Sequence, residues 1–272
     1  MNRTLQTVLF WILAFLITVS AAVYQRMTGP TYPKRVELNT ANEIVKLKLI
    51  RSAEGSDNCP LAFEIADTSI SAMVEYRRYP TNDEWVKEAL TRDQSNLTGS
   101  LPGQPPAGKI EYKVLFYKDG KQMNDPEEYH TIVRYKGVVP GWVLGPHILS
   151  MFIAMLLANF AGIIAIARRP NARLYMWLTF AFLTVGGMIM GPLLQLYAFG
   201  DLWTGIPFGW DLTDNKTLIA YVAWIVALIM NRKGVNYRWI IVATIVTLII
   251  FSIPHSMFGS EFNYATGSVT QG

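Results

Sequence analysis

Two of the three histidines follow a proline, His147 after Pro146 and His255 after Pro254. Each pair stands at one end of a long apolar segment, and the topology given below puts both at the same membrane depth. Imidazole nitrogens ligate haem iron and other transition metals, and ionisable groups inside membrane bundles often mark functional sites. One interpretation is therefore a haem b or metal site formed by His147 and His255. The alternative is an interfacial position, where an imidazole reaches water or lipid headgroups.

The segment 203–216 is rich in aromatic residues and ends in Asp211, Asp214 and Asn215. The apolar run after it has about fourteen residues, whereas a straight membrane span needs about twenty. Counting back draws these polar residues into the start of the helix or the headgroup layer. Acidic side chains there can cap the free amides at a helix N-terminus. The functional alternative is a cation or quinol-headgroup site built by Asp211, Asp214 and Asn215 with the nearby histidines.

Polar and small residues interrupt the apolar segments. Asn159 and Gln195 are amides that can hydrogen-bond across a contact between helices, and Gly187 and Gly191 form a pair that lets a neighbouring helix approach closely. We interpret these four residues as helix-packing positions. Pro192, directly after Gly191, should break or bend its helix because proline removes one backbone hydrogen bond and crowds another.

These residues are positioned by long apolar segments, which predict a membrane bundle of about five transmembrane α-helices. The segments are 7–23, 142–167, 174–199, 217–230 and 237–253. We expect the first, within 1–26, to be a retained signal anchor, although Ser20, Ala21 and Ala22 resemble a cleavage site. The other four form a transmembrane region at 138–256, and 257–272 is a tail.

Basic residues orient the bundle. Arg3 and the short loops 168–173 and 231–238 fall on one side if there are five spans, and the positive-inside rule makes that side cytoplasmic. The expected location is a bacterial inner membrane with a cytoplasmic N-terminus. The inserted domain, the loop 200–216 and the C-terminal tail then face the periplasm. Trp142, Trp203 and Trp210 are expected to anchor the bundle at the interface with the lipid bilayer.

Residues 35–137 show the alternation of β-strands, best seen at 44–50, 70–79 and 109–117. The turn 118–121 and the proline-rich loop 101–108 separate such segments, which favours an all-β sandwich domain inserted after the first helix. The run 72–78, then Trp85, the proline-rich loop and 111–114 resemble a fibronectin type III or immunoglobulin-like module. This resemblance implies a fold and no activity.

Composition excludes several classes of protein. Hydrophobic residues make up 51% of the 272 residues and charged residues only 16%, which indicates a bilayer as solvent. The net charge of +4 is scattered, so nucleic acid is not an expected partner. The single cysteine, Cys59, excludes an intramolecular disulfide. The β domain contains no phosphate-binding glycine loop, nucleophile elbow or zinc-spaced cluster, and no catalytic residues are predicted.

Three functions are compatible with these features. The first is a non-catalytic or accessory subunit of a membrane complex, whose β domain docks a partner protein on the outer side. The second is a redox subunit in which His147 and His255 hold haem b and exchange electrons with quinol at the outer face. The third and weakest is a transporter component, because no inverted repeat is evident.

Overall fold

The computed structural model describes residues 2–40, 43–254, 257 and 259–270. The chain divides into two compact units, which we describe separately. The helical unit comprises Met1–Pro30 and Val139–Gly259. The β unit comprises Thr31–Val138 together with Ser260–Thr270. The chain therefore leaves the helical unit after its first helix and leaves it again near its C-terminus.

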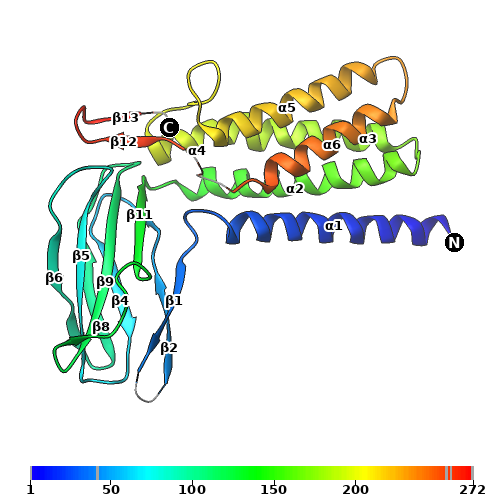
Figure 1. The fold of residues 1–272 in the computed structure, drawn as a ribbon. Helices are drawn as coiled ribbons and strands as arrows, with labels where there is room; N and C mark the ends of the chain where they lie inside the picture. The colour runs from blue at the N-terminus through cyan, green and yellow to red at the C-terminus, as the bar shows by residue number, and fades with distance from the viewer. Residues whose placement is uncertain (1, 41–42, 255–256, 258, 271–272) are drawn as a thin grey trace. The chain divides into compact units, whose positions relative to one another are not determined.

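The helical unit contains the five expected apolar segments as helices, drawn in Figure 1. In the described residues, four helical stretches are long and apolar enough to cross a membrane, and α6, with 16 residues, is shorter. The segments α3, η1 and α4 follow one another without a break. The bounds are α1 Arg3–Met27, α2 Gly141–Ile166, α3 Ala172–Leu183, the π-helix η1 Thr184–Met190, α4 Gly191–Phe199, α5 Leu212–Met230 and α6 Tyr237–Ser252.

Small residues let these helices approach closely. A Cβ atom added to Gly162 of α2 would lie 2.5 Å from Cγ2 of Thr244 on α6. One added to Gly187 would lie 2.7 Å from Cγ2 of Thr217 on α5. Both distances are shorter than real Cβ contacts, so a larger residue at either position would force Thr244 or Thr217 to shift. At Gly191 the nearest atom to such a Cβ is a carbonyl oxygen of its own helix, at 3.6 Å.

Hydrogen bonds between side chains also join neighbouring helices. Asn159 of α2 donates from Nδ2 to Thr18 Oγ1 of α1 over 2.9 Å. Trp224 of α5 donates from Nε1 to Thr247 Oγ1 of α6 over 2.8 Å. All four side chains are buried. In a medium without water such pairs satisfy groups that would otherwise be costly to bury.

The sequence predicts a break or bend near Gly191 and Pro192. The structure instead has a π-helical segment directly before these residues. The turn before Gly191 is π-helical over Thr184–Met190, and the helix then continues to Phe199. Pro192 has no N–H to offer to the preceding turn. A π-helical turn changes which carbonyls need donors and often accompanies functional positions.

The β unit contains four sheets in the described part of the chain (Figure 1). The largest has the order β3-β11-β9-β5-β6, with β10 paired to β9, and the second has the order β4-β8-β7. Two hairpins, β1-β2 and β12-β13, complete the unit. The strands are β1 Lys34–Asn39, β2 Ile44–Leu49, β3 Ser52–Glu54, β4 Cys59–Glu64, β5 Ile70–Tyr79, β6 Val86–Ala89, β7 Thr91–Asp93, β8 Asn96–Leu101, β9 Lys109–Lys118, β10 Lys121–Gln122, β11 His130–Lys136, β12 Glu261–Asn263 and β13 Ser268–Thr270.

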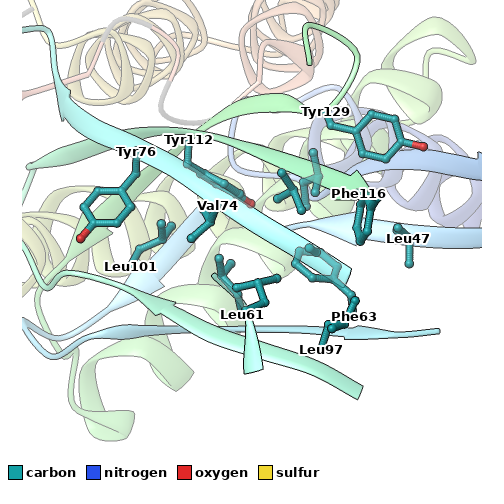
Figure 2. Close-up of a cluster of buried hydrophobic side chains, with 14 of the residues drawn as sticks. Leu47, Leu61, Phe63, Val74, Tyr76, Leu97, Leu101, Tyr112, Phe116 and Tyr129 are labelled. Carbon is teal, nitrogen blue, oxygen red and sulfur yellow. The ribbon is translucent and has the colours of Figure 1, made fainter. Parts of the chain in front are cut away.

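Alternating residues of these strands form one apolar core, as the alternation in the sequence predicts. Figure 2 shows Leu61 and Phe63 of β4 gathered with Val74 of β5 and Phe116 of β9. The rings of Phe63 and Phe116 meet edge to face, with their centroids 5.9 Å apart. Burying such side chains is the main source of folding free energy in a domain of this size.

The buried tyrosines of this core keep their hydroxyl groups satisfied. Tyr112 donates to the carbonyl of Ile50 over 2.8 Å, and Tyr129 donates to the carbonyl of Glu37 over 2.7 Å. Burial raises the pKa of Tyr129 to about 12, because the phenolate would lose its hydration. These bonds tie the loop and hairpin carbonyls to the largest sheet.

Residues near the C-terminus do not form a free tail; they fold into the β unit as the hairpin β12-β13. Tyr264 lies at its centre, and its hydroxyl accepts a hydrogen bond from the N–H of Lys109 over 3.0 Å. The same hydroxyl lies 2.9 Å from the carbonyl oxygen of Lys109 and 2.9 Å from Gln104 Oε1, either of which can accept its proton. Lys109 also pairs with Glu261. Strands of three residues carry too little alternation to be predicted from sequence.

Replacing Tyr264 with Phe removes the acceptor for the Lys109 N–H while leaving the ring in place. We expect the hairpin to lose about 1–3 kcal/mol of stability, the usual cost of leaving a buried donor unpaired. Hydrogen exchange of residues 261–270 in the detergent-solubilised protein should accelerate accordingly. Ser268→Ala is the matched control, because its hydroxyl contacts only the exposed Thr266. Equal exchange in Tyr264→Phe and the wild type would contradict this role.

Candidate functional site

The loop between α4 and α5 is the candidate site of the helical unit. It begins at Gly200, whose φ of +94° ends α4 in a conformation that favours glycine. It ends at Asp211, which is the N-cap of α5 and accepts a hydrogen bond from the N–H of Thr213 over 2.8 Å. The expected capping role of Asp211 is thus confirmed. Its backbone N–H also donates to the carbonyl of Thr204 over 3.1 Å.

A chain of buried polar side chains holds this loop onto the helices. Gln195 of α4 donates from Nε2 to Thr204 Oγ1 over 2.9 Å. Thr204 in turn donates from its backbone N–H and its hydroxyl to Asp214 Oδ2, over 2.6 and 3.1 Å. All three side chains are buried. The carboxylate of Asp214 therefore stands at the first turn of α5, where the helix dipole also favours a negative charge.

Asn215 extends the same network by one residue. Its Oδ1 accepts a hydrogen bond from the N–H of Ile206 over 2.8 Å. Gly205 lies between these attachment points, and a Cβ added there would stand 2.8 Å from both Asn215 Oδ1 and Asp214 Cβ. We name Gln195, Thr204, Asp214 and Asn215 the loop-binding network. Asp214 and Asn215 accept hydrogen bonds from loop backbone N–H groups, and Gln195 donates to the Thr204 side chain. These bonds favour a structural role over an open cation site.

Lys216, which sequence reasoning missed, is the next residue of α5 and is 1% exposed. Its Nζ donates to the carbonyls of Ile253 and Pro254, over 2.9 and 3.1 Å, at the C-terminal end of α6. Gln25 of α1 donates to the same Ile253 carbonyl over 3.2 Å. A cation suits this place, because the last carbonyls of a helix lack intrahelical donors and carry partial negative charge. Its signal in the sequence was a single lysine five residues after N-cap Asp211.

The loop presents large apolar side chains on its outer surface. Phe208 and Trp210 are each 73% exposed, and Leu202 and Ile206 are also exposed. We name these four residues the apolar loop surface. Of the three expected interfacial tryptophans, Trp142 and Trp210 are exposed, whereas Trp203 is partly buried and donates from Nε1 to the carbonyl of Ile206 over 3.1 Å. Burial of the backbone polar groups and exposure of apolar side chains thus occur in one loop.

His147 lies in the second turn of α2 and contacts the π-helix. Its Nδ1 is 2.9 Å from the carbonyl oxygen of Gly186. Because a carbonyl only accepts, Nδ1 carries a proton, and in the neutral ring Nε2 then carries the lone pair, the arrangement found in many ligating histidines. His255, the other expected ligand, lies outside the described residues. Among the residues that the structure describes, no group of three metal-ligating side chains is present.

Comparison with known proteins assigns no family to this chain. No protein-family model, curated protein or solved structure matches it.

Replacing Asp214 with Ala removes the acceptor for two hydrogen bonds from Thr204. We expect the loop to open more often by roughly tenfold to a hundredfold, since two hydrogen bonds of about 0.5–1.5 kcal/mol each are lost. Hydrogen exchange of residues 202–210 measures this opening. Asp201→Ala removes an exposed acidic side chain from the same loop and should leave exchange unchanged. Equal effects of the two substitutions would show that the network does not hold the loop.

Proposed function

We propose that this chain is a non-catalytic subunit of a membrane complex, in which the apolar loop surface binds a partner protein at the membrane boundary. The main support for the proposal is that the α4–α5 loop has its backbone bound on the inside and its apolar side chains exposed on the outside. The backbone N–H groups of Thr204 and Ile206 are bound by Asp214 and Asn215, and the large apolar side chains of the loop are exposed. Chemistry on a substrate needs polar groups that are free to act, whereas recognition needs a positioned apolar surface.

The residue types of the apolar loop surface suit recognition. Phe and Trp are enriched in protein interfaces because they bury a large area with few rotatable bonds. A loop anchored through Asp214 and Asn215 also loses little conformational entropy on binding. A membrane interface is the other environment that favours such side chains, so the test must separate a protein from lipid.

The β unit offers a second recognition surface. We propose that it is an immunoglobulin-like or fibronectin type III-like sandwich, supported by its two larger sheets and their shared core. Strand β6, Val86–Ala89, forms an edge of the largest sheet, and all four of its residues are exposed. Such an edge can pair with a strand of a partner.

Chain connectivity supports five membrane crossings. The chain enters the β unit after α1, leaves it before α2 and returns to it after α6. A folded domain lies on one side of a bilayer, so α6 must cross to bring the hairpin β12-β13 back to that side. Its 16 residues are near the lower limit for a span. With the basic loops in the cytoplasm, the β unit and C-terminus face outward, as in a bacterial inner membrane with a cytoplasmic N-terminus.

A photoreactive amino acid placed at Phe208 tests the proposal in native membranes. We expect illumination to produce a discrete protein adduct, because this position should lie in an interface. The control position is Ile245, an exposed residue in the middle of α6 that would face lipid. Adducts only with lipid at Phe208, or the same protein adducts at both positions, would contradict a specific interface.

A redox subunit is the second candidate, favoured by the position of His147. The Gly186 carbonyl fixes Nδ1 as the donor, which leaves Nε2 able to ligate haem iron together with His255. Bound haem b would supply one-electron chemistry, and His147 would orient and hold it.

The absorption spectrum of detergent-purified, haem-supplied protein tests the haem hypothesis. A Soret band that disappears in both His147→Ala and His255→Ala would establish a bis-histidine site. His130→Ala, in the β unit, is the control and should retain any such band. A folded wild-type protein without a Soret band would exclude haem b and leave the accessory function as the account.

A further inference from the structure

A pocket of about 470 Å³ lies in the helical unit, between the C-terminal end of α2 and the N-terminal end of α6. These two helices pack side by side (Figure 1). Half of its lining is apolar and half is polar or cationic, including two arginines. The lining residues are Ala165, Ile166, Arg168, Val235, Asn236, Tyr237, Arg238 and Ile241.

Charge in the helical unit is divided between its two ends. Six cations gather where α2 joins α3 and α5 joins α6. Arg168, Arg169, Arg232 and Lys233 lie in the two loops, and Arg173 and Arg238 lie in the first turns of α3 and α6. Within the sequence ranges 1–30 and 139–259 the only carboxylates are Asp201, Asp211 and Asp214, which lie in the α4–α5 loop and the first turn of α5. The two arginines of the pocket therefore have no carboxylate of this unit beside them. Among the described residues, neither takes part in an ion pair.

The backbone at the pocket is held in an unfavourable conformation. Arg168 follows the C-cap of α2 with a φ of +52°, a region that glycine or asparagine usually occupies at a helix end. The hydroxyl of Tyr237, the first residue of α6, donates to the Arg168 carbonyl over 3.0 Å. Tyr237 thus connects Arg168 to α6. Backbone strain that persists in a structure often marks a functional position.

We propose that this pocket binds the phosphate group of an anionic phospholipid. Arg168 and Arg238 supply the positive charge that a phosphate needs, and arginine matches its oxygens with paired donors. Ile166 and Val235, both exposed apolar residues of the lining, provide a surface for the start of an acyl chain. A soluble phosphate would use the arginines without needing these apolar neighbours. Basic pockets at the ends of membrane helices suit anionic headgroups for the same reasons.

The test compares retention of lipid by the full chain in neutral detergent, measured by native mass spectrometry. The probes are phosphatidylglycerol, phosphatidylcholine and inorganic phosphate. We expect the wild type to retain phosphatidylglycerol at least tenfold better than phosphatidylcholine. Arg168→Gln with Arg238→Gln should lose this preference. The control, Arg232→Gln with Lys233→Gln, removes the same charge from an adjacent loop and should keep the preference within about twofold, because direct phosphate contacts exceed screened surface attraction.

Two further measurements separate the pocket from general charge and from folding. Arg168→Gly should raise the unfolding temperature in phosphatidylcholine, because glycine relieves the positive φ, while weakening retention of phosphatidylglycerol. Equal loss in both double variants, or retention unchanged in Arg168→Gln with Arg238→Gln, would overturn the site. Complete displacement of phosphatidylglycerol by millimolar inorganic phosphate would overturn the assignment to a lipid.

Discussion

The hydrogen bonds from Thr204 to Asp214 are the interaction on which the candidate site depends. A polar group withdrawn from water in a membrane bundle needs a partner, and here the partners are the backbone and hydroxyl of a neighbouring loop. Gln195 likewise donates to the Thr204 hydroxyl oxygen, and Asn215 accepts a hydrogen bond from the N–H of Ile206. Because the polar atoms are satisfied inside, the loop can turn Phe208 and Trp210 outward. The same rule explains Lys216, whose charge meets the free carbonyls at the end of α6.

In the β unit, strands bury an apolar core, and the buried hydroxyls of Tyr112, Tyr129 and Tyr135 donate to backbone carbonyls. Its closing element is the hairpin β12-β13, attached through Tyr264 and Lys109. This attachment bears on how many times the chain crosses the membrane. A segment that follows α6 in sequence belongs to the same folded unit as the segment that follows α1. The number of crossings is therefore constrained by folding as well as by hydropathy, which matters for a helix as short as α6.

The strongest local patterns predicted the elements correctly. Alternation over 70–79 and 109–117 identified β5 and β9, and the acidic start of the fourth apolar segment identified the cap at Asp211. Other features depend on distant partners and leave no local pattern. Lys216 is explained by carbonyls 37 and 38 residues away, and Tyr264 by the first residue of β9, 155 residues away. A break or bend was predicted at Pro192, whereas the structure has a π-helix before it. The π-helix could not be predicted, because the effect of a proline on its helix depends on the packing of the preceding turn. The left-handed Arg168 likewise has a distant partner, because its carbonyl accepts a hydrogen bond from Tyr237 of α6.

The central claim is that five crossings place the apolar loop surface and the hairpin β12-β13 on one side of the membrane. Labelling with a membrane-impermeant maleimide in oriented vesicles tests it most directly, because the single natural cysteine, Cys59, is buried. Phe208→Cys and Thr266→Cys should be labelled from the same side, and Lys233→Cys only after the membrane is permeabilised. Labelling of Lys233→Cys and Thr266→Cys from one side would mean that α6 does not cross, and would contradict the account.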